Sequence, residues 1–181
     1  AGTDSLNGGE GSDLYLVSVA SEHTAAEFAD AGLQGLDEVR FAATTSSTLT
    51  LYAADTGVER VVIGTGIDAV ANSSGTLGLH VNAAAVGNAL SVVGNAGNNQ
   101  LIGTAFADTL DGSLGSDTLV GGNGDDTYVL NTTADRITEA STVCSDTVVS
   151  SVTHTLGTYL EHLTLSGTDA INGTGNGSAN V

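Results

Sequence analysis

The sequence predicts an all-β protein in which many short parallel strands stack as the coils of a solenoid. Three observations favour this fold class. The chain is 40% hydrophobic but only 4% aromatic, its glycines recur at a nine-residue spacing, and it contains no proline. A core of Val, Leu, Ile and Ala suits many thin layers better than one thick centre, and the lack of proline is compatible with long strand ladders. The hydrophobic content also argues against a disordered chain.

The nine-residue pattern is clearest in the middle of the chain. Four consecutive units begin with Gly, carry Asn or Asp at position six and place Leu or Tyr at position eight: GNAGNNQLI (94–102), GTAFADTLD (103–111), GSLGSDTLV (112–120) and GGNGDDTYV (121–129). A fifth unit, GGEGSDLYL, occupies 8–16. The glycine-rich first six residues predict a turn, and the last three predict a very short strand whose middle residue points inward. Two units then complete one coil.

Further strands are expected where β-branched and hydrophobic residues lie between Gly, Asn, Asp and Ser turns. These segments are 48–53, 60–64, 79–83, 90–94, 146–156 and 162–167. The segment SEHTAAEFADAGLQG (21–35) contains Ala and Glu but no clear apolar stripe. We therefore expect a loop or one short helix there.

The sequence also contains a second repeat with a longer period. GGEGSDLYLV (8–17) matches GGNGDDTYVL (121–130), and GVERVVIGTGIDA (57–69) matches YLEHLTLSGTDA (159–170) with Glu59 aligned to Glu161. The spacing predicts two modules of roughly 100 residues each. We place them at 1–93, with the insertion near 21–35, and at 94–181; one continuous solenoid is the alternative.

The charge balance restricts the partners. The chain has 3 Lys and Arg residues against 21 Asp and Glu residues, and its formal net charge is -18. Such a surface repels nucleic acid and anionic lipid and attracts cations. No apolar run approaches the ~18 residues that a membrane span needs, so membrane insertion is not expected.

The stacking of coils predicts a cation site. Units two apart lie about 4.8 Å from each other in a strand ladder, which places Asp108 beside Asp126 and Asn99 beside Asp117. Two carboxylates at that spacing repel each other unless a cation lies between them, and glycine turns let backbone carbonyls point at the same place. A hard, all-oxygen site of this kind favours Ca²⁺. Because Asn99 replaces Asp, its site should be the weaker one.

The units GGNGDDTYV, GSLGSDTLV and GGEGSDLYL resemble the RTX (hemolysin-type) calcium-binding nonapeptide repeat. The longer pattern, which runs from GGNGDDTYV to INGTGN, is similar to modules of very large bacterial extracellular RTX proteins. The resemblance implies a right-handed parallel β-roll, export by a type I system and folding upon meeting extracellular Ca²⁺. The unit at 103–111 departs from the family pattern at Thr104 and Phe106, where the pattern prefers glycine.

The resemblance also implies a set of Ca²⁺ ligands. Position six supplies side chains and the turn residues supply carbonyls, which gives Asn99, Gly103, Ala105, Asp108, Gly112, Leu114, Asp117, Gly121, Asn123 and Asp126. Weaker sites are expected at Asp4, Gly9, Gly11, Asp13 and Asp169. Asp4 and Asp13 lie nine residues apart on opposite sides of the roll, so a preceding module or insertion residues would have to complete their sites.

Other reactive residues give no catalytic pattern. The sequence has no HExxH, GxSxG or phosphate-binding loop, so we expect no enzyme, and the four histidines share no metal-ligand spacing. Glu59 and Glu161 are interpreted as edge or calcium-adjacent residues, with an acid pair as the alternative. Cys144 is expected to be a small buried residue at a strand position; an intermolecular disulfide is the alternative.

The predicted function is that of a secreted, calcium-stiffened structural module, such as an adhesin stalk, a filament or a surface-layer component. Its partners would be Ca²⁺ ions, neighbouring modules or identical copies end to end, and cell-surface glycans. One alternative is the C-terminal secretion and folding region of a secreted hydrolase or epimerase. Another is a carbohydrate-binding module.

Overall fold

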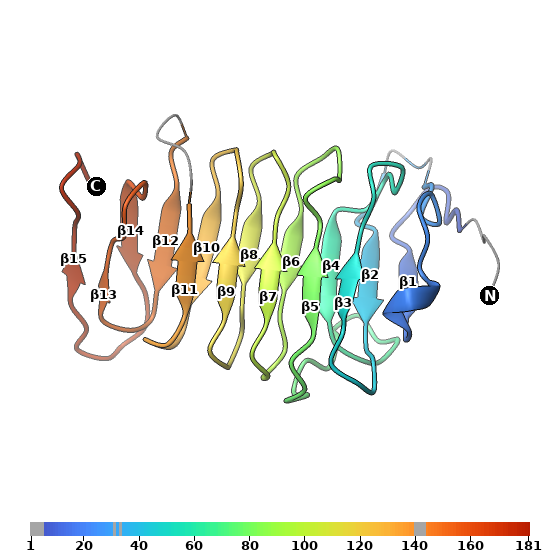
Figure 1. Ribbon diagram of the computed structural model, residues 1–181, viewed down its shortest axis with the longest axis horizontal. Helices are drawn as coiled ribbons and strands as arrows, with labels where there is room; N and C mark the ends of the chain where they lie inside the picture. The colour runs from blue at the N-terminus through green and yellow to red at the C-terminus, as the bar shows by residue number, and fades with distance from the viewer. Residues whose placement is uncertain (1–5, 31, 33, 140–143) are drawn as a thin grey trace.

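The computed structural model describes residues 6–30, 32, 34–139 and 144–181. It is a parallel β-solenoid of about 8 turns, in which the chain passes back and forth between two sheets as it advances along one long axis (Figure 1). The segments that contain Leu14–Val17 and Gly173–Thr174 lie at opposite ends of this axis (Figure 1). The predicted all-β solenoid is confirmed.

The larger sheet has eight strands that pair in parallel. Their order is β1 (Leu14–Val17), β2 (Glu38–Phe41), β4 (Arg60–Ile63), β6 (Ser91–Val93), β8 (Thr109–Asp111), β10 (Thr127–Leu130), β12 (Thr147–Ser150) and β14 (His162–Leu165). The second sheet has five strands, in the order β11 (Arg136–Thr138), β9 (Thr118–Val120), β7 (Gln100–Ile102), β5 (His80–Asn82) and β3 (Thr48–Thr50). Two short strands, β13 (His154–Thr155) and β15 (Gly173–Thr174), form a separate pair.

Strand register confirms that two nonapeptide units complete one coil. Thr109 pairs with Thr127 in the larger sheet, and Gln100 pairs with Thr118 in the smaller one. Outside the repeat run the coils are longer, because loops are inserted; Arg60, for example, pairs with Ser91. The larger sheet continues through β6 and β8 across the proposed module boundary, and the division into modules stays a prediction.

The core is a thin row of inward-pointing side chains between the two sheets. Position eight of each repeat lies in this row, as expected from strand alternation. The central members are 0% exposed: Val61, Val81, Val92, Leu101, Leu110, Leu119, Tyr128 and Val148. Each coil thus buries one or two apolar side chains per strand, and contacts with neighbouring coils complete the packing.

Most expected strands are present, with shorter bounds. The expected strand 146–156 is divided into β12 and β13 by a turn at 151–153. The segment 21–35 is mainly loop, and the 3-10 helix η1 (Ala20–Glu22) overlaps its start. Sequence patterning missed β2 and β11, because charged residues interrupt their hydrophobic alternation.

The expectation for Cys144 is wrong. This residue is half-buried and lies in the turn before β12 rather than in a strand. Its Sγ accepts a hydrogen bond from the Gly124 backbone N–H at 3.3 Å.

In the part of the chain that the structure describes, no helix has the length and apolar character to cross a membrane.

Candidate metal centres

An acidic residue stands directly before almost every strand of the larger sheet; β6, which follows Leu90, is the exception. We call this set the acid column: Asp13, Asp37, Glu59, Asp108, Asp126, Asp146 and Glu161. A second column stands before β7, β9 and β11 and consists of Asn99, Asp117 and Asp135. Position six of the nonapeptide therefore marks the junction between turn and strand.

A ladder of hydrogen bonds connects the members of each column. The Asp126 Oδ1 atom accepts the backbone N–H of Asp108, one coil earlier, at 2.8 Å. Asp146 Oδ1 accepts the N–H of Asp126 at 2.8 Å. In the second column, Asp117 Oδ1 accepts the N–H of Asn99 at 2.7 Å. The structure thus brings together the two pairs that the sequence suggested, but each contact joins a carboxylate to a backbone N–H.

The ladder extends beyond the nonapeptide run. Asp37 accepts from Asp13 at 2.8 Å, and Glu59 accepts from Asp37 at 2.9 Å. At the other end, Glu161 accepts from Asp146 at 2.9 Å. Glu59 and Glu161 are therefore members of the acid column, and their interpretation as calcium-adjacent residues stays a prediction.

The glycine at position one makes room for the carboxylate at position six. A Cβ atom on Gly112 would lie 2.3 Å from Asp117 Oδ2, and one on Gly121 would lie 2.1 Å from Asp126 Oδ2. These distances are far below van der Waals contact, so any larger residue would displace the carboxylate. In these units the carboxylate at position six can take its place only because position one is glycine.

Two of these carboxylates are incompletely paired. Asp117 and Asp126 are each 1% exposed, and their Oδ2 atoms have no hydrogen-bond partner among the described residues. Burial, reinforced by the carboxylates of Asp135 and Asp111, raises the pKa of Asp117 to about 7. Burial and neighbouring carboxylates likewise raise the pKa of Asp126 to about 7. A buried carboxylate oxygen without a donor requires a cation or a proton beside it.

The position-six side chains of the two preceding units, Asn99 and Asp108, have hydrogen-bond partners at both of their polar atoms, from their own turn and from an earlier coil. Asp108 accepts hydrogen bonds from Leu90 N–H at 2.7 Å and from Thr104 N–H at 2.5 Å. The Thr104 hydroxyl also donates to the Asp108 carboxylate and lies 3.0 Å from each of its two oxygens. Asn99 accepts from Asn95 N–H at 2.9 Å and donates to the Leu79 carbonyl at 2.6 Å. The departures from the repeat at Thr104 and Asn99 therefore satisfy the polar atoms at position six by hydrogen bonds within the protein.

Backbone carbonyls converge on the same turns. The Gly112 carbonyl oxygen and Asn99 Oδ1 both lie 2.4 Å from the position that a Cβ on Gly94 would take. The Gly121 carbonyl and Asp108 Oδ2 meet in the same way at Gly103. The carbonyls of Gly103, Ala105, Leu114 and Asn123 belong to these turns, and their role as ligands stays a prediction.

Three acidic residues meet at each of two places in the acid column. One cluster contains Asp13, Asp30 and Asp37, and the other contains Asp126, Glu139 and Asp146; in each, the carboxylate oxygens lie within 4.8 Å of one another. The predicted carbonyl donors Gly9 and Gly11 lie in the turn that leads to Asp13. Asp4 lies outside the described residues, and Asp169 lies in an exposed turn that belongs to neither column.

Sequence reasoning missed several column and cluster residues. Asp37 stands at position six of a further glycine-led unit, GLQGLDEVR (32–40), whereas Asp135 and Asp146 follow no such unit, and Asp30 and Glu139 lie in connecting segments. The signal that identifies the first three is an acid directly before a short hydrophobic strand, as in DRIT (135–138) and DTVV (146–149).

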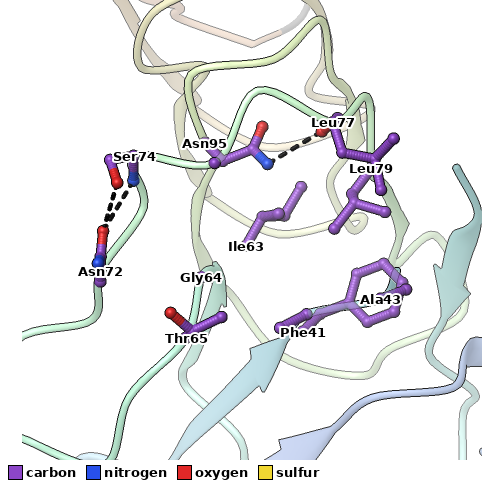
Figure 2. Close-up of a pocket in the computed structure, with 12 residues that line it drawn as sticks. Phe41, Ala43, Ile63, Gly64, Thr65, Asn72, Ser74, Leu77, Leu79 and Asn95 are labelled. Atoms are coloured by element: carbon purple, nitrogen blue, oxygen red, sulfur yellow. Dashed lines mark hydrogen bonds between the residues drawn. The ribbon is translucent and has the colours of Figure 1, made fainter. Parts of the chain in front are cut away.

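A cavity of about 240 Å³ lies between the end of β4 and the turn before β5 (Figure 2). The residue directly before β5 is Leu79 rather than an acid. Phe41, Ile63 and Leu79 form its apolar wall, and Asn95 donates from its side chain to the Leu77 carbonyl at 3.0 Å (Figure 2). None of the twelve residues that line it is titratable. The cavity therefore offers no acid, base or metal ligand of its own beyond neutral oxygens.

Comparison with known proteins agrees with the repeat geometry. The family model described as RTX calcium-binding nonapeptide repeat (4 copies) matches residues 1–15 and 93–128. These ranges include Asp108, Asp117 and Asp126. Neither the curated proteins nor the solved structures yield a match to this chain.

Proposed function

Because the chain carries RTX calcium-binding nonapeptide repeats, we propose that it is an extracellular structural module whose coils are held together by Ca²⁺. The observation that supports this most strongly is the pair of buried, unpartnered Oδ2 atoms of Asp117 and Asp126. Repeats of this family are typical of secreted bacterial proteins. Extracellular fluid also supplies Ca²⁺ at the concentrations that such modules need.

The donor set fits Ca²⁺. It consists of carboxylates from two neighbouring coils and of carbonyls from flexible glycine turns, and Ca²⁺ accepts six to eight such oxygens in irregular geometry. Mg²⁺ demands a stricter octahedron and retains its water. Asp117 and Asp126 would supply the charged ligands, with Asp135 and Asp146 from the following coils.

Calcium would act here through electrostatics. The net charge of -18 and the columns of stacked acids favour an expanded chain, and bound cations remove that repulsion. Extracellular calcium modules bind with dissociation constants of roughly 10⁻⁴–10⁻³ M. At ten times that concentration each site stabilises the fold by about 1.4 kcal/mol, so a few sites are comparable to the stability of a small domain.

A stiff solenoid suits a stalk, a filament or a surface layer. Each coil of a solenoid contacts only its neighbours, so the end coils are natural docking surfaces for adjacent modules or identical copies. Cell-surface glycans would be contacted by the exposed faces.

The experiment that tests this function is small-angle X-ray scattering in Ca²⁺ and in EGTA, with Mg²⁺ as the control ion. We expect an elongated, compact particle in Ca²⁺ and an expanded chain in EGTA or Mg²⁺. An identical scattering profile in all three solutions would refute the proposal.

A further inference from the structure

The two three-acid clusters are built in the same way. Two members of each belong to the acid column, from consecutive coils, and the third comes from the segment that connects those coils. Asp30 lies between β1 and β2, and Glu139 lies between β10 and β12. The repeat alone does not supply this third carboxylate.

A buried tyrosine holds the third acid in both clusters. The Tyr15 hydroxyl donates to Asp30, and the Tyr128 hydroxyl donates to Glu139. Tyr15 is 6% exposed and Tyr128 is 0% exposed. Each stands at position eight of its nonapeptide, where the other units have leucine, namely Leu101, Leu110 and Leu119.

The tyrosine hydroxyl reaches the turn as well as the third acid. Gly8 N–H donates to the Tyr15 hydroxyl at 2.9 Å and to Asp30 at 3.2 Å. A Cβ on Gly121 would lie 2.1 Å from the Tyr128 hydroxyl oxygen. In both units the phenol therefore lies between the first glycine and the third carboxylate, a position that leucine cannot fill.

The coil that contains Glu139 is longer than a repeat coil. Asp126 and Asp146 are separated by 20 residues, whereas Asp108 and Asp126 are separated by 18. The spacing between β9 and β11 is still that of a repeat coil, so the additional residues lie after β11, next to Glu139. The chain thus departs from the repeat at the point where the third acid enters.

Unpartnered oxygens point to a ligand in this cluster. Asp126 and Asp146 are each 1% exposed, and the Oδ2 atom of each has no hydrogen-bond partner among the described residues. In the first cluster, Asp13 Oδ2 is also buried and has no hydrogen-bond partner among the described residues, while Asp13 as a whole is half-buried. Three carboxylates within 4.8 Å repel one another strongly at low dielectric, which a bound cation would reverse.

We propose that the Asp126–Glu139–Asp146 cluster, and its counterpart Asp13–Asp30–Asp37, are tyrosine-held Ca²⁺ sites that bind more tightly than the turns of the repeat run. This inference rests on the proposed calcium-binding function and adds a second class of site to it. Affinity for Ca²⁺ rises with the number of charged ligands and with the rigidity of the site. The tyrosine hydroxyl is a positioning group, because it orients a ligand without contacting the ion.

Terbium luminescence tests the proposal, because Tb³⁺ replaces Ca²⁺ and emits when a nearby tyrosine is excited. The chain has 4 Tyr and no Trp, so emission excited through tyrosine reports Tb³⁺ beside a tyrosine. We expect strong emission from the wild-type protein, a partial loss in Tyr15→Phe and in Tyr128→Phe, and a nearly complete loss in the double variant. Tyr52→Phe, which changes a tyrosine outside both clusters, should leave emission unchanged.

The variant Glu139→Gln separates the ligand from the fluorophore, because it keeps Tyr128. Calorimetry with Ca²⁺ should show one site weakened by at least roughly 10-fold in Glu139→Gln and by roughly 10–100-fold in Tyr128→Phe, with the remaining sites unchanged. Glu22→Gln, an exposed acid, is the matched control.

Two negative results have different meanings. If the wild-type protein binds no Ca²⁺, the proposed function fails and this inference fails with it. If the wild-type protein binds Ca²⁺ but Glu139→Gln and Tyr128→Phe change neither emission nor affinity, this inference alone is overturned.

Discussion

Asp126 shows at the scale of one residue how the repeat creates a need for a cation. Its Oδ1 atom accepts the backbone N–H of Asp108, while its Oδ2 atom is buried without a partner. Asn99 occupies the same position in an earlier unit, and its side-chain amide bonds Asn95 and the Leu79 carbonyl instead. The chain itself therefore shows that a neutral amide fits where the carboxylate stands.

The substitution Asp126→Asn should have opposite effects with and without Ca²⁺. In EGTA it removes a buried unpaired charge, so the free energy of unfolding should rise by about 1–3 kcal/mol. In saturating Ca²⁺ it removes a ligand, so stability should fall and the affinity of that site should decrease by more than about tenfold. The far-UV β-sheet signal that remains in EGTA measures the first effect, and urea unfolding in Ca²⁺ measures the second.

Asp169→Asn is the control for charge alone, because Asp169 is exposed and belongs to neither column. A change of the same sign in both solutions for Asp126→Asn would contradict the assignment of Asp126 as a ligand.

Gly112→Ala tests the steric pairing of glycine and aspartate. The new methyl group would lie 2.3 Å from Asp117 Oδ2, so we expect a loss of about 1–3 kcal/mol in Ca²⁺. Gly87→Ala has nothing within 4 Å of the added atom and should be neutral or stabilising by less than about 1 kcal/mol. Equal stabilities for the two variants, measured by urea unfolding, would rule out the steric account.

At this scale the sequence predicted which side chains lie together but not how they are bonded. The spacing of two units placed Asp108 beside Asp126 and Asn99 beside Asp117, and the structure brings both pairs together. The saturation of Asp108 by Thr104 depends on the turn conformation, which the nine-residue period does not specify.

At the scale of the element, the nonapeptide run is the most regular part of the solenoid. Strands β7 to β10 follow directly from the period, because each unit contains one turn and one strand. Strand β2 also ends a glycine-led unit (32–40), but its charged residues Glu38 and Arg40, which are buried, obscure the hydrophobic alternation. Arg40 donates to the carbonyls of Gly66 at 2.7 Å and Asp68 at 2.6 Å. Tertiary contacts of this kind leave no periodic signal in the sequence.

The insertion after β1 is held by one buried histidine. His23 contacts Glu27 at 2.7 Å and Asp55 at 2.9 Å through its two ring nitrogens, and its ring stacks on Phe28 with centroids 4.5 Å apart. Burial lowers the pKa of His23, but the hydrogen bonds to Asp55 and Glu27 outweigh it, and the net pKa lies above 6.5. The charged imidazolium form of His23 therefore holds the insertion against the solenoid through its contacts with Glu27 and Asp55.

The sign of the pH effect follows from that shift. A raised histidine pKa stabilises the segment below about pH 6.5, and the contribution is lost as the pH rises through the folded-state pKa. In the calcium-loaded protein, hydrogen exchange at the Ala29 amide, which donates to the Leu6 carbonyl at 3.1 Å, should be less protected at about pH 9 than at about pH 6 after correction for intrinsic rates. His23→Gln should abolish the difference and His162→Gln should preserve it. Equal protection at both pH values would contradict this role.

At the scale of the whole molecule, the stabilisation from a thin apolar core is opposed by the mutual repulsion of many negative charges, which give a net charge of -18. Of the 21 acids, nine stand in the two columns along the solenoid, and the stacking of these nine couples the charge to folding. The composition predicted both the thin core and the affinity for cations. It could not predict the third acids Asp30 and Glu139, because their positions depend on how the connecting segments fold back onto the columns.

Removal of Ca²⁺ should give the protein an unusual pH dependence. The pKa values of Asp117 and Asp126 are raised from 3.8 to about 7 in the folded state, so the folded chain holds these protons more tightly than the unfolded chain. Their stabilising contribution is present below about pH 4 and is lost as the pH rises to about 7. In calcium-free solution the far-UV β-sheet signal should therefore be larger at about pH 5 than at about pH 8, and Ca²⁺ should remove or reverse this order. A calcium-free protein that is more stable at the higher pH would show that these carboxylates are not buried as described.

The most direct test of the central claim is far-UV circular dichroism of this chain as EGTA removes Ca²⁺ near pH 8. The account predicts that the β-sheet signal present in Ca²⁺ is largely lost in EGTA and returns when Ca²⁺, but not Mg²⁺, is added back. A spectrum that does not change on addition of EGTA would contradict the claim that cations between the coils hold this solenoid together.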